Sequence, residues 1–193
     1  MNPIVNYDDV MKRLKIVFEK NGVKENEKNP FFKKAKLEDL ECLLHVYDYF
    51  THWTSIYLND ELAVIKDLVI PTYIIDFYRN YEPCHQPMTQ AGIYLFNLKR
   101  IQEENSNSVL LKYKLLTIAC TIGGDSVCLD FNLDEPSVVL IDHTEIPLVE
   151  EIEKYFPTYD DIKSIIHLVS ESFSEFLWKY SGDEYGDLED EYL

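Results

Sequence analysis

The chain has 193 residues, of which 46 % are hydrophobic and 13 % aromatic, enough for a real core in roughly one domain, so wholesale disorder is not expected. Its 35 acidic residues against 18 basic ones give a formal net charge of −17. That charge weighs against nucleic acid and anionic membranes as partners, because binding either needs clustered lysine and arginine. It favours a basic protein partner, although acidity for solubility alone is an equally good reading of it.

The charge is unevenly distributed along the chain. Half of the basic residues fall between Lys12 and Lys36, and none lies between Leu115 and Glu153. Nine carboxylates occupy that base-free stretch: Asp125, Asp130, Asp134, Glu135, Asp142, Glu145, Glu150, Glu151 and Glu153. The segment 181–193, SGDEYGDLEDEYL, is again acidic without a base, a composition typical of solvated, disordered tails and sometimes of interaction tails.

The first predicted element is a helix after Asn6. Asn6 or Asp8 can cap its start and Gly22 can end it. Its expected buried face consists of Val10, Leu14, Val17 and Phe18. Residues 23–36 follow as a charged linker. A second helix begins at Leu37, with apolar residues at helical spacing at Leu37, Leu40, Leu44 and Tyr47. His45, His52 and Trp53 are read as packing or surface residues rather than ligands.

A proline opens the next predicted helix. Pro71 suits the first turn, where its missing N–H costs nothing, and Pro83 stops the helix. The expected apolar face is Ile74, Ile75, Phe77 and Tyr78. From residue 91 the period changes to short apolar or alternating runs, which predict four strands, at 91–98, 115–122, 126–133 and 137–144.

The last predicted element is a helical stripe from Ile162 to Tyr180. Thr158 with Asp161, and Ser172 with Glu175, have capping-box spacing, so one long helix and a short element followed by a helix at Ser172 are both open. Gly182 ends the stripe. Helices, then strands, then helix, without strand–helix alternation, predict an α+β fold: a mainly antiparallel twisted sheet with helices packed against it. The predicted division is a helical N-terminal extension at 1–60, an α+β domain at 61–180 and an acidic tail at 181–193.

The four cysteines carry no recognisable chemistry. Cys42, Cys84, Cys120 and Cys128 form no CxxC pair and no metal-ligand spacing, so neither a metal nor a cofactor is expected. Cys120 and Cys128 lie in apolar strand-like runs and read as small buried hydrophobes. The opening MNPIVNYDDV lacks the features of a signal peptide, and no run is long and apolar enough to span a membrane. A cytoplasmic location is therefore expected.

The step Gly123-Gly124-Asp125 has two readings. Two glycines between strand-like runs predict a hairpin turn, because a positive φ costs glycine little. A phosphate-binding loop needs a helix after it, and a Walker loop needs Gly-Lys-Ser or Gly-Lys-Thr, which is absent here. A strand-like run follows instead, and the surroundings are acidic. The hairpin is therefore the favoured reading.

Four groups of residues follow one another along the chain: Pro71, Phe77 and Tyr78; Ile101 with Glu104 and Asn105; Gly123, Gly124 and Asp125; and Ser172, Phe173, Phe176 and Leu177. Their order and spacing resemble the SUKH superfamily, which joins a fungal cell-wall-assembly regulator to many bacterial immunity proteins. The resemblance covers roughly Glu61 to Tyr180. It departs from the family where Tyr81-Glu82-Pro83 replaces the usual Asn-Gly-Gly, and it leaves the N-terminal helices unconstrained.

The resemblance implies a non-catalytic protein-binding module, an immunity protein that blocks a toxin, with a nuclease as the expected class. An acidic surface could occupy the basic cleft in which a nuclease holds nucleic acid. The candidate contacts are Asp125, Asp130, Asp134, Glu135, Asp142 and Glu145, each of which also reads as a solvated turn carboxylate. The alternative is an intracellular scaffold like the fungal relative. An enzyme is the least favoured reading, although Asp142-His143 with Asp125 could be drawn as an acid–base or metal site.

Overall fold

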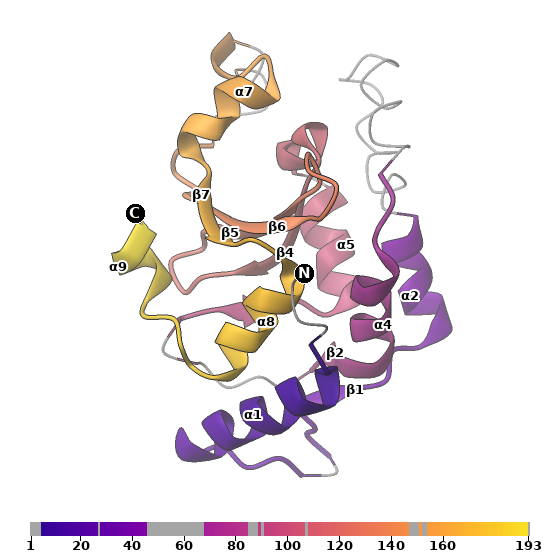
Figure 1. Ribbon diagram of the computed structural model, residues 1–193. Coiled ribbons are helices and arrows are strands. Elements are labelled where there is room, and N and C mark those ends of the chain that lie inside the picture. Colours follow the sequence, from indigo (N-terminus) through magenta and orange to yellow (C-terminus); the bar gives the residue numbers. More distant parts are fainter. Residues whose placement is uncertain are drawn as a thin grey trace.

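A computed structural model gives the α+β fold shown in Figure 1, and it describes residues 5–26, 28–45, 68–84, 89, 91–106, 108–146, 151 and 154–192. Five strands form one antiparallel sheet in the order β3-β4-β5-β6-β7. Their bounds are β3 Tyr94–Leu95, β4 Leu115–Cys120, β5 Ser126–Asp130, β6 Ser137–Ile141 and β7 His167–Ser170. The predicted fold class is confirmed.

The fifth strand was not predicted from the sequence. β7 lies inside the stripe that was read as helical, between a short 3-10 helix, η3 (Lys163–Ile165), and α8 (Phe173–Ser181). Of the two alternatives left open, the short element followed by a helix at Ser172 is therefore the right one, with a strand added. The β7 backbone pairs with β6, whose edge would otherwise lack hydrogen bonds, and this tertiary pairing overrides the local 3.6-residue period.

Both faces of the central strands are buried. Residues alternate along β5 and β6, so Val127, Leu129, Val138 and Leu140 join one apolar cluster and Cys128, Val139 and Ile141 join another. The larger cluster also holds residues of α1 (Tyr7–Lys20), α4 (Thr72–Tyr81), α5 (Leu98–Ser106) and α8. The smaller cluster holds residues of η2 (Val109–Tyr113), α7 (Tyr159–Ile162) and η3. Figure 1 shows α7 across the sheet from α8. Polar side chains of these strands therefore reach solvent mainly at the turns.

The first helix forms as the sequence predicts. α1 spans Tyr7–Lys20, the side chain of Asn6 accepts the backbone N–H of Asp8, and the predicted stripe Val10, Leu14, Val17 and Phe18 is buried. The segment 23–36 is more than a charged linker, which corrects the prediction. Phe31 is buried, and β1 (Phe32–Lys33) pairs antiparallel with β2 (Glu82–Pro83). Phe31 and Phe32 both pack on the ring of Phe18. These apolar contacts hold the segment on the core although lysines surround it.

The second helix turns a different face to the core than predicted. α2 spans Leu37–Leu44, with Leu40 and Leu43 buried, whereas Leu37 is 75 % exposed and Leu44 is 44 % exposed. Positions three and four residues after Leu40 both lie about one helical turn away from it. The sequence pattern predicts Leu44 on the buried face, whereas the structure buries Leu43. Tyr47, His52 and Trp53 lie outside the described residues. The buried residues of α1 and α2 belong to the same cluster as those of the sheet, and a domain boundary at residue 61 stays a prediction.

The proline-led helix and the C-terminal helix form the predicted core. α4 buries Ile74, Phe77 and Tyr78, with Pro71 at its N-cap and Ile75 partly buried. α8 begins after Ser172, whose hydroxyl accepts the backbone N–H of Glu175, and it buries Phe173, Phe176 and Leu177. The capping box of Thr158 and Asp161 starts α7 as predicted.

The acidic tail is ordered, which corrects the expectation of a solvated, disordered segment. Tyr185 and Leu188 are buried in the larger cluster, and α9 spans Leu188–Tyr192. The hydroxyl groups of Tyr185 and Ser170 hydrogen-bond at 2.5 Å, which ties the tail to β7. The tail is thus held by apolar side chains that are spaced among its carboxylates. The overall acidic composition does not reveal these contacts.

A buried amide joins α5 to the sheet. α5 was missed because its sequence is mostly polar, yet Asn105 on it is fully buried. The pairing of β3 with β4 ends near Ile118. The backbone N–H and carbonyl of Thr117, which point away from β5, therefore have no strand to pair with. The Asn105 side chain replaces that strand, because its amide donates to the Thr117 carbonyl at 2.7 Å and accepts from the Thr117 N–H at 2.9 Å.

The Asn105 bridge generates a stability prediction. Asn105→Ala leaves two buried backbone groups of Thr117 unpaired, so the free energy of unfolding should fall by about 3 kcal/mol, at about 1–3 kcal/mol for each orphaned group. Urea denaturation followed by circular dichroism measures it. The control is Ser106→Ala, on the same helix, whose hydroxyl donates to the Glu103 carbonyl. Equal losses for the two variants would show that the bridge adds nothing specific.

Candidate functional site

The Gly123-Gly124 step forms a hairpin turn, as the sequence predicts. Gly124 has φ +101°, a conformation that glycine adopts readily, and β5 rather than a helix begins at Ser126. The backbone N–H of Thr121 donates to the Asp125 carbonyl at 3.0 Å and closes the turn. Without a helix N-terminus facing it, the loop lacks the donor set that a phosphate site needs.

The six candidate carboxylates separate into two groups at opposite ends of β5 and β6. Asp125 precedes β5, and Asp142 and Glu145 follow β6, at one end. Asp130, Asp134 and Glu135 lie at the other end, around the β5–β6 turn. Five residues of antiparallel strand separate the two ends by about 17 Å. The candidates therefore do not form one continuous acidic face.

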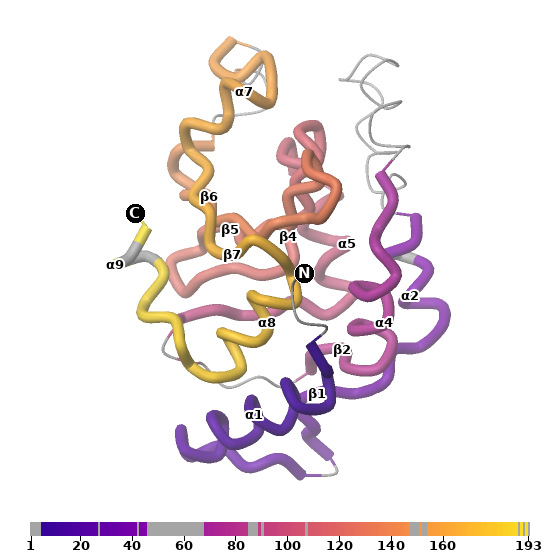
Figure 2. The backbone as a smooth tube through the Cα atoms, viewed as in Figure 1, coloured from indigo at the N-terminus to yellow at the C-terminus, as the bar shows by residue number. Residues whose placement is uncertain are grey.

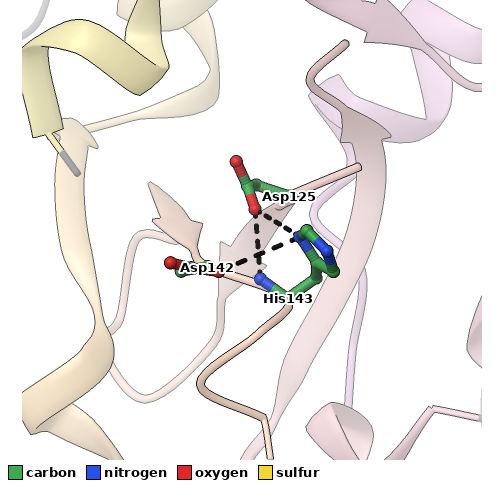
Figure 3. Close-up of side chains that lie close together, drawn as sticks. All are labelled: Asp125, Asp142 and His143. Carbon is green, nitrogen blue, oxygen red and sulfur yellow. Dashed lines mark hydrogen bonds and ion pairs between the residues drawn. The ribbon is translucent and has the colours of Figure 1, made fainter. Parts of the chain in front are cut away.

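Asp125 is a buried structural carboxylate. It is 4 % exposed. Its Oδ2 accepts the Thr121 hydroxyl at 3.2 Å, and its Oδ1 accepts the backbone N–H of His143 at 3.1 Å. The ring nitrogen Nδ1 of His143 lies 2.8 Å from the same Oδ1, as Figure 3 shows. One side chain thus joins the β4–β5 hairpin to the residue that leaves β6.

Asp142 organises the turn after β6. Its Oδ1 accepts both the backbone N–H and the hydroxyl of Thr144, each at 2.7 Å. These two hydrogen bonds lower the pKa of the Asp142 carboxyl below its ordinary value, because both favour the charged form. The contact is an Asx turn, in which an aspartate side chain replaces a backbone acceptor.

Asp125, Asp142 and His143 carry atoms that could bind a metal ion. Among the described residues these three offer ligand atoms that lie within 4.8 Å of one another. The geometry favours hydrogen bonds instead. Asp125 Oδ1 and His143 Nδ1 are 2.8 Å apart, shorter than the roughly 3.3 Å that separates two ligands held at about 2.0 Å in a tetrahedral zinc site. Each contributing Asp Oδ1 also has two partners already within hydrogen-bond distance.

Asp130 is the second structural carboxylate, at the opposite end of β5. It is 4 % exposed, and its Oδ1 accepts the backbone N–H and the side-chain amide of Asn132 at 2.9 and 2.7 Å. Its Oδ2 accepts the hydroxyl of Tyr159 on α7. Burial, and then this hydrogen bond to a carboxylate, raise the pKa of the Tyr159 hydroxyl. Asp130 thereby fastens α7 to the end of the central strand.

The carboxylates that face solvent at this end lie beside exposed apolar side chains. Asp134 and Glu135 are exposed in the β5–β6 turn. Leu133 is 62 % exposed and Val69 is 79 % exposed. A shallow cavity of about 200 Å³ is lined there by Leu68, Val69, Pro71, Lys114, Phe131, Leu133, Asp134 and Pro136. We call Val69, Leu133, Asp134 and Glu135 the turn patch.

The cysteines offer no activated nucleophile among those whose side chains are described. A catalytic cysteine needs a lowered pKa. Burial instead raises the pKa of Cys84 and Cys120, and it raises the pKa of Cys128 to about 12. Cys128 is fully buried, as predicted, and Cys120 is partly buried.

No family model, curated protein or solved structure matches this chain. Within the described part of the chain, the helices are too short or too polar to cross a bilayer. The described carboxylates of the site thus divide into two that are buried in hydrogen bonds, Asp125 and Asp130, and others that are not fully buried.

That division generates a stability prediction. Asp125→Ala leaves the His143 N–H and the Thr121 hydroxyl without their acceptor and should lower the free energy of unfolding by about 3 kcal/mol. Asp134→Ala, in the exposed turn, should change it by less than about 0.5 kcal/mol. Chemical denaturation of both variants measures these changes in the free energy of unfolding. A similar decrease at both positions would contradict the division into buried and exposed carboxylates.

The raised thiol pKa generates a second prediction. With a pKa of about 12, Cys128 stays protonated at neutral and mildly basic pH, so it should not react with a thiol reagent while the protein is folded. Mass spectrometry after alkylation at about pH 8 should find Cys128 modified only in denaturant. Modification in the native protein at the rate of a free cysteine would mean that the smaller cluster opens readily.

Proposed function

We propose that this chain is a non-catalytic protein-binding module that binds a basic protein partner in the cytoplasm. The role that fits best is that of an immunity protein that blocks a toxin, with a nuclease as the class of toxin. The single observation that carries the proposal is the stretch from Leu115 to Glu153, which holds nine carboxylates and neither lysine nor arginine. A surface built from such a stretch attracts cations over long range and speeds the encounter with a basic protein.

The burial of individual carboxylates supports the turn patch as the contact surface. Asp125 and Asp130 are enclosed by their own hydrogen bonds, so their charges are not available for a partner. Asp134 and Glu135 face solvent beside Leu133 and Val69. Apolar side chains next to a charged rim are the usual composition of a protein interface, where the apolar part is buried and the rim steers association.

The hydrogen bonds of the two carboxylates argue against catalysis at Asp125, Asp142 and His143. A general base must reach the proton that it removes, and a metal must find open ligands. Asp125 is enclosed, and Asp142 is occupied by Thr144. These groups support a structural role at the base of two turns.

The scaffold alternative is favoured by one observation of its own. Nine of the 18 basic residues lie between Lys12 and Lys36, in α1, β1 and the chain around them. A protein that only blocks a basic toxin has no need for a concentrated basic region. A scaffold that holds one basic and one acidic partner at different places does.

Charge reversal in the turn patch tests the proposal. The double variant Asp134→Lys/Glu135→Lys should slow association with the basic partner about tenfold or more, while dissociation, set by buried contacts, changes less. The effect should shrink as salt rises, because the Debye length is about 8 Å at physiological ionic strength. The partner to test is the protein encoded beside this chain's gene, because many of the bacterial immunity proteins that the chain resembles are encoded next to a toxin. The measurements are binding kinetics at low and high salt and the protection of cells that co-express this partner.

A matched control separates local contact from net charge. Glu38→Lys/Asp160→Lys makes the same charge change at side chains that are 75 % and 85 % exposed, on α2 and α7. It should slow association much less. Reversal of Asp125 or Asp130 is not a clean test, because either change places an unpaired charge inside the protein. If the control slows binding as much as the turn-patch double, the turn patch is not the interface.

A further inference from the structure

A positively charged region stands at one end of this acidic protein. Residues 12–36 hold nine bases and three acids, a net charge of +6, which leaves −23 on the rest of the chain. Figure 2 shows α1 and the chain that leads to β1 together at the lower end of the molecule, away from α7. The fold therefore keeps these bases together in space as well as in sequence.

A groove runs between α1 and this part of the chain. Its volume is about 270 Å³, and it is lined by Met11, Lys12, Lys15, Glu25, Phe31, Phe32 and Tyr81. Four of these are apolar or aromatic side chains. Lys12 and Lys15 are 73 % and 53 % exposed. The groove thus offers an apolar floor beside ammonium groups that still face water.

The opposite flank of α1 already holds an acidic segment with apolar anchors. Arg13 forms an ion pair with Glu184 at 2.5 Å and lies over the ring of Trp178 at 3.8 Å. The residues that follow Glu184 bury Tyr185 and Leu188. The chain's own acidic C-terminal segment is therefore held by a base on α1 together with buried apolar side chains.

We propose that the groove between α1 and β1 binds an acidic protein segment that carries one aromatic or long apolar side chain. The apolar side chain enters the groove against Met11, Phe32 and Tyr81. A carboxylate of the segment takes the place of Glu25, which pairs with Lys15 at 3.3 Å and accepts the backbone N–H of Phe31. A second carboxylate takes the place of Asp9, which pairs with Lys12 at 2.9 Å. This surface and its acidic partner are independent of the turn patch and its basic partner.

An acidic protein segment fits this surface better than a nucleic acid does. A nucleic acid strand carries a charge at every nucleotide and would run from the basic end onto a body of charge −23, where it is repelled. A short acidic segment needs only the few charges that Lys12 and Lys15 can match. Its apolar side chain gains from leaving water in a groove with an apolar floor.

Fluorescence anisotropy with defined probes tests this proposal. The probes are a labelled glutamate-rich peptide with one central phenylalanine, the same peptide with alanine in place of phenylalanine, a lysine-rich counterpart, and a single-stranded oligonucleotide. The protein variants are Lys12→Glu/Lys15→Glu, the milder Lys15→Gln, and a control, Lys99→Glu/Lys163→Glu. The control reverses two lysines that are 78 % and 54 % exposed and that, like Lys12, form ion pairs within one helical turn.

The phenylalanine peptide should bind the wild-type protein, the alanine peptide should bind more weakly, and the lysine-rich peptide should not compete for this groove. Affinity for the phenylalanine peptide should fall about tenfold or more in Lys12→Glu/Lys15→Glu and less in Lys15→Gln. It should fall about twofold or less in the control double, because salt screens charges that are not in direct contact with the peptide. Three results overturn the proposal: no binding below a Kd of roughly 1 mM, equal losses in groove and control doubles, or tighter binding of the oligonucleotide than of the peptide.

Discussion

The hydrogen bonds of one buried carboxylate, Asp125, make part of the chain's negative charge a component of its fold. Asp125 accepts from Thr121 in its own hairpin and from His143 beyond β6, so two turns of the sheet meet at one side chain. Asp130 repeats the arrangement at the other end of β5, where it joins Asn132 and α7. Because a buried charge is stable only when it is well paired, these carboxylates belong to the fold. The turn patch, whose carboxylates face solvent, is therefore the surface that we propose for binding.

The distribution of charge then suggests a molecule with two different surfaces. The central strands are buried on both faces, so polar groups gather at the strand ends and on the outer sides of helices. The acidic turn patch lies at one end of β5 and β6. The bases of residues 12–36 surround a groove beside α1. Opposite partners at separate places would let the charges steer two associations without competing, since each field decays within about one Debye length, about 8 Å.

Local patterns in the sequence predicted the elements whose own residues determine them. The stripe of α1, the proline before α4, the glycine hairpin and four of the strands all follow from spacing and turn chemistry. Two of the elements that the sequence did not predict have a different cause. β7 forms because β6 needs a partner, and Asn105 on the polar helix α5 is buried because β4 needs one. Such pairing connects residues far apart in sequence, so no local period reports it.

The residues of the candidate site could be predicted from the sequence, but their burial could not. The sequence identifies the base-free stretch and its carboxylates, and it suggests that Asp125, Asp142 and His143 could meet. It does not reveal that Asp125 and Asp130 are enclosed while Asp134 and Glu135 are exposed. All four are acidic residues at or beside strand ends. They are distinguished by their donors, which are Thr121 and His143 for Asp125, and Asn132 and Tyr159 for Asp130. The ordered acidic tail is a similar case, because two buried anchors outweigh its charge.

Carboxyl footprinting tests the central claim most directly. Carbodiimide coupling of an amine to side-chain carboxylates, followed by mass spectrometry of the peptides, gives a labelling rate for each position in the native protein. The account predicts fast labelling at Asp134, Glu135 and Glu145 and slow labelling at Asp125 and Asp130 until the protein is unfolded. Labelling of Asp125 and Asp130 at the rate of the exposed positions would contradict it.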